Sequence, residues 1–129
     1  MSGPLDVVGA ARSILAGRRR RHRFIPAELL GEPAWDMLLD LLVSQAEGRD
    51  VSIKHACIAS GVPNTTAKRC LDALTARGMV DHNPDPDDRR RTLLVLTPSG
   101  DAKVRAAILD TLQFSVVSVQ SDESMMEAA

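Results

Sequence analysis

The chain has 129 residues, 44% of them hydrophobic and 26% charged, with a net charge of −1 at pH 7. These values are typical of one folded domain with a single core, and the near-neutral charge does not by itself indicate a polyanionic partner. No apolar stretch approaches the length of a membrane span, and no apolar segment of a signal peptide follows the basic N-terminal run. We therefore expect a cytoplasmic protein without a membrane partner.

Charge is unevenly distributed along the chain. Residues 1–30 have a local balance of +4, residues 49–78 a balance of +3, and residues 101–129 a balance of −3. A local basic face is what an electrostatic footprint on nucleic acid requires. The small net charge therefore hides two basic zones and an acidic tail.

The first part of the chain predicts two helices. Residues 4–17 place apolar side chains at helical spacing, and the arginine-rich run RRRRHRF follows at 18–24. A connector with two prolines and a glycine covers 25–33. Residues 33–47 form the clearest predicted helix, because Pro33 suits a first turn and the apolar residues make one stripe. That stripe consists of Trp35, Leu38, Leu39, Leu42 and Val43.

Two short helices joined by a tight turn are predicted next. Ser52 has the features of an N-cap for a helix over 53–60, and Gly61 suits a left-handed C-cap. Asn64 is expected to cap a second helix over 65–77. This spacing is that of a helix–turn–helix unit, whose second helix can enter the major groove of DNA.

The remaining pattern predicts a hairpin and a final helix. A brief strand is expected at 50–52, and two longer strands at 79–82 and 91–97. The longer strands are close enough in sequence to pair across the charged loop 83–90. Residues 97–114 begin with a threonine cap and a first-turn proline, and predict a helix.

The exposed start of the second helix of the helix–turn–helix carries polar and basic side chains. Such side chains can hydrogen-bond to base edges or phosphates, and the helix N-terminus itself favours a phosphate. The candidate DNA-binding residues here are Asn64, Thr65, Thr66, Lys68 and Arg69. The alternative is an ordinary helix pair with a solvated polar face.

A hairpin directly after a helix–turn–helix is a wing. Its tip can lie along the DNA backbone or in the minor groove, where Arg89, Arg90 and Arg91 would supply cations to a narrow, negative groove. The Asp–x–Arg spacing from Asp88 to Arg90 lets the carboxylate hold the guanidinium across a tight turn. Surface ion pairs add little stability, so the value of this pair is orientation. The alternative is a solvated loop whose acids only neutralise its arginines.

Residues 59–100 resemble the MarR family of winged helix–turn–helix transcription regulators. The matching features are TTAKRCLDALTARGMV, the wing DPDDRRRTLLVLT and the LTPSG that opens the next helix, in the family's order and spacing. The resemblance implies a mainly α fold with a small β-hairpin wing, and a homodimer that reads a pseudo-palindromic site in double-stranded DNA, usually as a repressor. It also implies that Asp88 orients Arg90 into the minor groove, while Thr65, Thr66, Lys68 and Arg69 face the major groove.

The same resemblance suggests three segments. Residues 32–97 would form the winged helix–turn–helix DNA-binding domain, and residues 1–31 and 98–129 would serve dimerisation. We expect helices over 4–20 and 98–118 to build the dimer by burying their apolar stripes, so that truncating either gives monomers. Unlike family members, the chain has only a short acidic tail after its last predicted helix. The alternative function is a winged-helix protein-interaction module without specific DNA binding.

The other notable residues predict no second chemical site. The run Arg18–Arg23 has three interpretations: a DNA-backbone arm, a basic helix beside the dimer, or a solvated helix end. Cys57 and Cys70 fall on the inner faces of their helices, so we expect free thiols that pack as small hydrophobes rather than a redox switch. Neither metal-ligand spacing nor a catalytic constellation is found, so we expect no metal, no cofactor and no enzyme. The sequence neither indicates nor excludes a small-molecule effector pocket near Trp35 and Phe24.

Overall fold

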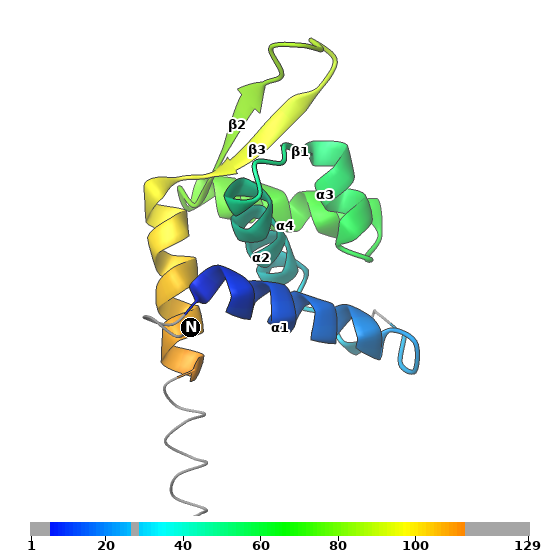
Figure 1. Cartoon of the computed structure of the whole chain (residues 1–129). Helices are drawn as coiled ribbons and strands as arrows, with labels where there is room; N and C mark the ends of the chain where they lie inside the picture. The colour runs from blue at the N-terminus through cyan, green and yellow to red at the C-terminus, as the bar shows by residue number, and fades with distance from the viewer. Residues whose placement is uncertain (1–5, 27–28, 113–129) are drawn as a thin grey trace, which may run out of the picture.

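The computed structural model describes residues 6–26 and 29–112 (Figure 1). In chain order the elements are α1 (Val7–Arg21), α2 (Pro33–Ala46), β1 (Val51–Ser52), α3 (Ile53–Ala59), α4 (Asn64–Ala76), β2 (Val80–Pro84) and β3 (Thr92–Leu96). A further helix covers residues 98–112, and we name it the C-terminal helix. The expected start of the first helix and end of the last lie outside the described residues. None of the helices in the described ranges is long and apolar enough to cross a membrane.

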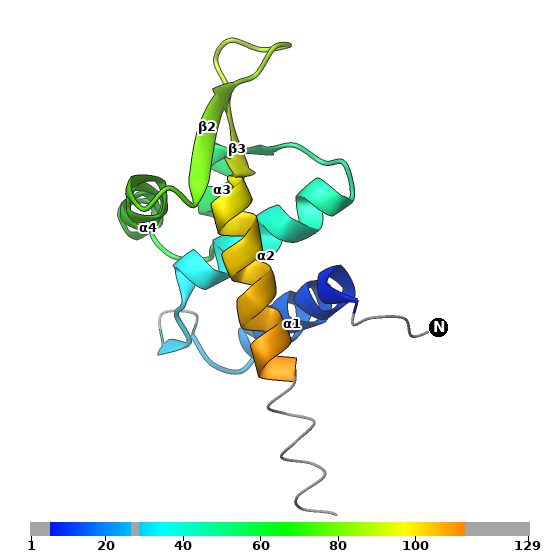
Figure 2. The same ribbon diagram turned by 90° about the vertical axis from the view of Figure 1, so that its left-hand side faces the viewer.

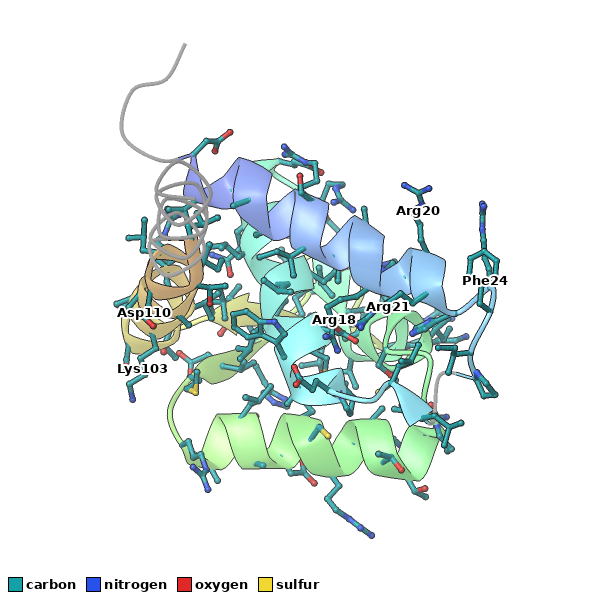
Figure 3. The ribbon with its side chains drawn as sticks, turned by 90° about the horizontal axis from the view of Figure 1, so that it is seen from below. Arg18, Arg20, Arg21, Phe24, Lys103 and Asp110 are labelled. Carbon is teal, nitrogen blue, oxygen red and sulfur yellow. The ribbon has the colours of Figure 1, made fainter. Side chains whose placement is uncertain are left out.

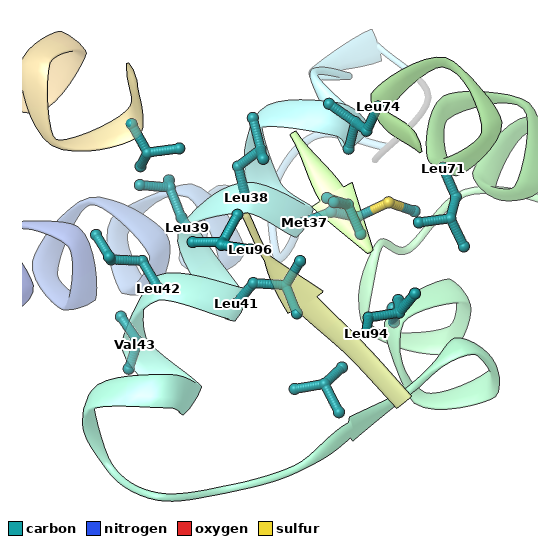
Figure 4. Close-up of a cluster of buried hydrophobic side chains, with 14 of the residues drawn as sticks. Met37, Leu38, Leu39, Leu41, Leu42, Val43, Leu71, Leu74, Leu94 and Leu96 are labelled. Carbon is teal, nitrogen blue, oxygen red and sulfur yellow. The ribbon is translucent and has the colours of Figure 1, made fainter. Parts of the chain in front are cut away.

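The central element of the fold is α2. It lies between α1 on one side and α4 on the other (Figures 2 and 3). Every residue from Met37 to Ser44 is buried, so the helix is covered all round rather than along the predicted stripe. Met37 and Leu41 lie outside that stripe and are nevertheless in the core (Figure 4). A helix that is apolar on most sides is stable only inside a fold, and α2 takes that place.

The arginine run is part of α1, which continues through Arg21. Four arginines occupy its last turn, where positive charge interacts favourably with the C-terminal end of the helix dipole. Two of them also reach acids one turn apart on α2. Arg18 pairs with Asp36, and the Arg19 guanidinium lies 3.6 Å from Asp40. This part of the run is therefore a basic helix end that helps to hold α1 on α2.

The start of α3 agrees with the sequence prediction, and the helix ends at Ala59, one residue before the predicted end. The Ser52 hydroxyl accepts a hydrogen bond from the backbone N–H of His55 at 3.1 Å, as an N-cap does. Gly61 follows the helix with a φ of +72°, a conformation that side-chain-bearing residues rarely adopt. The chain can therefore turn tightly from α3 into α4.

The predicted start of α4 is wrong by one residue. Pro63, not Asn64, is the N-cap, and its carbonyl accepts the backbone N–H of Ala67 at 3.0 Å. Pro63 has a φ of −55° and a ψ of 148°, which its ring favours and which starts the helix one residue earlier than expected. The Asn64 side chain makes no capping hydrogen bond and is exposed, so it can bind a partner.

The sheet has three antiparallel strands in the order β1-β3-β2. The hairpin pairs Val80 with Leu96 at its base and Pro84 with Thr92 at its far end. β2 therefore runs two residues further than predicted, and the charged loop is shorter. Proline has no backbone N–H to donate to a neighbouring strand. Pro84 is tolerated because β2 is an edge strand and Pro84 stands at its end. β3, the central strand, is covered on both faces as expected, since Leu93 and Leu94 are both buried.

The terminal helices use much of their apolar surface within one chain. Ala11 and Leu15 of α1, and Val104 and Ile108 of the C-terminal helix, are at most 5% exposed. All four belong to the core cluster that contains α2. The expectation that these stripes are buried against a second copy is therefore wrong for these four residues. Removing α1 would uncover α2, so truncation would not isolate a dimer contact.

Leu39→Ala should destabilise the fold strongly, because Leu39 is fully buried at the centre of α2. We expect a loss of about 2–5 kcal/mol in the free energy of unfolding, measured by urea denaturation at pH 7. The matched control is Ile58→Ala, which removes a side chain of the same size from the surface of α3, where it is 69% exposed and little change is expected. Similar losses in the two variants would contradict the central position of α2.

Candidate nucleic-acid interface

The exposed surface of α4 is separated cleanly from its buried side. Ala67, Leu71 and Leu74 face the core. All five candidate DNA-binding residues of this helix are exposed: Asn64, Thr65, Thr66, Lys68 and Arg69. At 100° per residue, Thr65 and Arg69 point most directly away from the core. The helix can therefore present polar side chains to a partner without uncovering apolar surface.

The wing loop is organised by a buried acid at its base. Asp85 is 7% exposed, and its carboxylate accepts the backbone N–H of Asp87 at 2.8 Å. The same carboxylate lies 3.3 Å from the Arg91 guanidinium. The Asp85 backbone N–H also donates to the Arg91 carbonyl at 3.1 Å. These contacts close the loop at its base, so its tip has a defined shape.

At the tip, Asp88 holds Arg90 as the Asp–x–Arg spacing predicted. One carboxylate oxygen accepts both the backbone N–H of Arg90 at 3.0 Å and its side-chain Nε–H at 3.1 Å. The Arg90 side-chain hydrogen bond, followed by the backbone hydrogen bond, lowers the pKa of the Asp88 carboxyl below its ordinary value. The Arg90 side chain is still 90% exposed. It is thus oriented by Asp88 while its charge remains accessible to a partner.

The three wing arginines are in different electrostatic environments. Arg91 pairs with the buried Asp85 and is about half exposed, so it is part of the loop's framework. Arg90 is oriented but accessible. Among the described residues, Arg89 has no acidic partner within ion-pair distance and is exposed. The positive charge available to a partner is therefore concentrated on Arg89 and Arg90.

A groove of about 720 Å³ separates the wing from the helix–turn–helix. Asn64 and Lys68 line it from α4, and Arg90 and Arg91 line it from the wing. Lys54 of α3 lies on its wall as well and was missed by the sequence analysis. The sequence offers little reason to select Lys54. It is a single lysine on the first helix of the helix–turn–helix, whereas the candidates came from the start of the second helix. The groove thus brings cations from three elements together.

The groove does not include all of the candidate DNA-binding residues or the arginine run. Thr65, Thr66 and Arg69 lie on α4 outside the groove lining. The arginine run is on α1, across α2 from α4 (Figure 3). In that view Arg20 and Phe24 project from the end of α1, away from α4. The run therefore forms a separate basic surface rather than an extension of the groove.

The cysteines and histidines build no further site on the described part of the chain. Cys57 is buried and Cys70 is partly buried, both as free thiols. No cluster of three or more potential metal ligands is found among these residues. His82 of β2 lies 2.9 Å from the Thr75 hydroxyl, which itself donates to the Leu71 carbonyl at 2.8 Å. The His82 nitrogen must then be the donor, which ties the wing to α4.

Sequence comparison locates the same unit. Residues 43–100 match the model of the winged helix DNA-binding domain family. The chain is 29% identical over 119 residues to the HTH-type transcriptional repressor NicR of Pseudomonas putida, and the match covers 92% of this chain and 75% of that protein.

Structural comparison establishes the fold over most of the chain. A mutant of S. aureus MepR bound to an oligodeoxyribonucleotide superposes with a TM-score of 0.56 at 17% identity, covering 95% of this chain and 86% of that one. The transcriptional regulator Tm0710 of Thermotoga maritima gives a TM-score of 0.53 at 23% identity, covering 90% and 71%. The winged helix–turn–helix fold expected from the sequence is therefore confirmed.

The Asp88 carboxyl should titrate below its ordinary pKa of 3.8 in the folded protein, as measured by NMR. Arg90→Ala should raise that pKa, because the largest cause of the lowering is lost, whereas Arg89→Ala should leave it nearly unchanged. Since folding lowers this pKa, the pair stabilises the fold at neutral pH, and the contribution is lost as the pH falls through the lowered pKa. An Asp88 pKa that is the same in all three proteins would contradict the contact.

Proposed function

Because residues 43–100 match the winged helix DNA-binding domain family, and the chain is similar in sequence to a transcriptional repressor and in fold to a transcriptional regulator, we propose that it is a transcription regulator that reads a specific sequence in double-stranded DNA. The observation that carries the proposal is Arg90, held by Asp88 and exposed, across a cationic groove from α4. Its role is DNA recognition rather than catalysis.

The residues divide between the two grooves of DNA. The outward side chains of α4, Thr65 and Arg69 above all, would meet base edges in the major groove, and Asn64, Thr66 and Lys68 would flank them. Arg89 and Arg90 would enter the minor groove or contact its phosphates. Lys54 and Lys68 line the protein groove between α4 and the wing. The DNA phosphate backbone that separates the major-groove contact from the minor-groove contact would have to pass along it. Arg91 serves mainly to hold the loop.

The protein-interaction alternative fits the same surface less well. A face that binds another protein usually exposes apolar side chains at its centre. Here the exposed front of α4 is polar or basic over Asn64–Arg69. The groove is lined by Lys54, Lys68 and Arg90, and by Arg91 paired with Asp85, against the single lining acid Asp88, and its exposed apolar residue is Ile58. This composition favours a polyanion.

We further propose that the protein acts as a homodimer on a pseudo-palindromic operator and represses transcription in the cytoplasm. Support for a protein contact comes from apolar side chains left in solvent near the end of α1. Phe24 is 85% exposed and Leu29 is 75% exposed. Side chains of this size in water often mark an interface. The C-terminal helix runs along the side of the domain, away from the wing, with its outer face in solvent (Figure 1).

A small-molecule effector would have a place between the helices. A cleft of about 420 Å³, within the range of ligand sites, lies between α1, α2 and α3. Arg12 and Asp40 are among its lining residues, whereas Trp35 and Phe24, beside which the sequence left a pocket open, are not. A ligand there would touch both α1 and the first helix of the helix–turn–helix.

Selection of random duplexes by the purified protein at two salt concentrations tests the proposed function. An inverted repeat with half-sites about one helical turn apart should be enriched, and its retention should fall as the salt concentration rises. Salt-sensitive retention with no enriched sequence would contradict specific recognition. No retention even at low salt would favour the protein-interaction module.

Arg90→Ala should weaken binding to the selected duplex by roughly 1–3 kcal/mol, measured by fluorescence anisotropy. The matched control is Arg20→Ala, which removes the same charge from the end of α1, across α2 from the groove. The control should change affinity much less. Equal losses in the two variants would show that only overall charge matters.

A further inference from the structure

The C-terminal helix is joined to the end of α4 by one side chain. The Thr97 hydroxyl donates to the Gly78 carbonyl at 2.6 Å and accepts the Gly100 backbone N–H at 2.9 Å. Its backbone N–H donates to the Met79 carbonyl at 3.0 Å. Gly78 and Met79 follow Arg77, the C-cap of α4, while Gly100 lies in the first turn of the C-terminal helix. Thr97 thus bonds to both helix ends at once.

The contact between these segments is too close for a larger residue. A Cβ atom built at Gly100 would lie 2.1 Å from the Met79 carbonyl oxygen, far inside van der Waals contact. Gly100 therefore allows the first turn of the C-terminal helix to rest directly on the chain that leaves α4. The backbone N–H of Met79 in turn donates to the Leu74 carbonyl within α4 at 3.0 Å. The joint is continuous from one helix to the other.

The joint lies where the C-terminal helix leaves the base of the hairpin and the end of α4. Past its first turns, the C-terminal helix extends away from the hairpin and α4 (Figure 2). Val104 and Ile108 anchor its inner side to the core. Thr97 and Gly100 would therefore set how the first turn of the C-terminal helix leaves the end of α4, while Val104 and Ile108 hold the rest of that helix on the core.

We propose that Thr97 is a positioning residue that sets the distance between the two DNA half-sites. This inference rests on the proposed homodimeric DNA reader, with the C-terminal helix in the dimer. The two copies of α4 would then be placed relative to each other through the two Thr97 joints. A base pair inserted between half-sites rotates one against the other by roughly 35°, which a rigid joint cannot follow. Thr97 would touch no DNA, so it would govern spacing and not half-site sequence.

The test is the random-duplex selection carried out in parallel on full-length wild type, Thr97→Val and Thr97→Ser. Valine keeps the shape of threonine but loses the hydroxyl, whereas serine keeps the hydroxyl. We expect the same half-site sequence from all three proteins. The valine variant should accept neighbouring spacings, and its preference for the best spacing over one longer by a base pair should fall by about fivefold, the equivalent of one ordinary hydrogen bond. Serine should restore the wild-type spacing.

Two further variants keep the test decisive. Gly100→Ala retains the Thr97 hydroxyl but forces the helix off Met79, so it should also change the spacing. Thr97→Ala replaces the valine variant if that protein does not show a cooperative thermal transition. If the valine and Gly100 variants select the same inverted repeat as the wild type, with equally sharp spacing, the spacing role of Thr97 is overturned and the proposed function is not. A wild type that enriches no repeat would overturn the proposed function, and the spacing role with it.

Discussion

Burial of α2 on all sides is the constraint on which the rest of the structure depends. Its apolar residues must be covered, and α1, α4, β3 and the C-terminal helix each cover part of it. Because all of these elements pack on one rigid helix, the directions of α4 and of the terminal helices are coupled. The apolar residues of α4 lie on the side that faces the core. Its opposite side carries polar and basic residues, which are exposed.

The acids of the chain determine which arginines are available to DNA. On α2, Asp36 and Asp40 pair with two arginines of the basic run and turn them into helix-to-helix contacts. In the wing, Asp85 pairs with Arg91 at the loop base, and Asp88 orients Arg90 at the tip. An arginine-rich sequence therefore becomes a structural contact in one place and an accessible, oriented cation in the other. Net charge alone reveals neither outcome.

Local sequence signals predicted local structure well. Ser52, Gly61 and the Asp88–Arg90 contact depend on residues at most three positions apart, and all have the predicted geometry. Asn64 was misassigned because both it and Pro63 can precede a helix. The role of the arginine run could not be predicted, since its partners on α2 lie 18 or more residues further along the chain. Lys54 lines the groove because the hairpin lies beside α3 in the folded protein, a long-range contact that the local sequence does not indicate.

The central claim is that the start of α4 and the wing tip form one DNA-binding face, separate from the arginine run on α1. It is tested most directly by NMR titration of the labelled protein with the duplex obtained by selection, following backbone amides and arginine Nε–H signals. The account predicts joint shifts in residues 64–69 and 85–92, including Arg90 Nε–H, with the signals of Arg20 and Arg21 little changed. Shifts centred on α1, or on α4 without the wing, would contradict it.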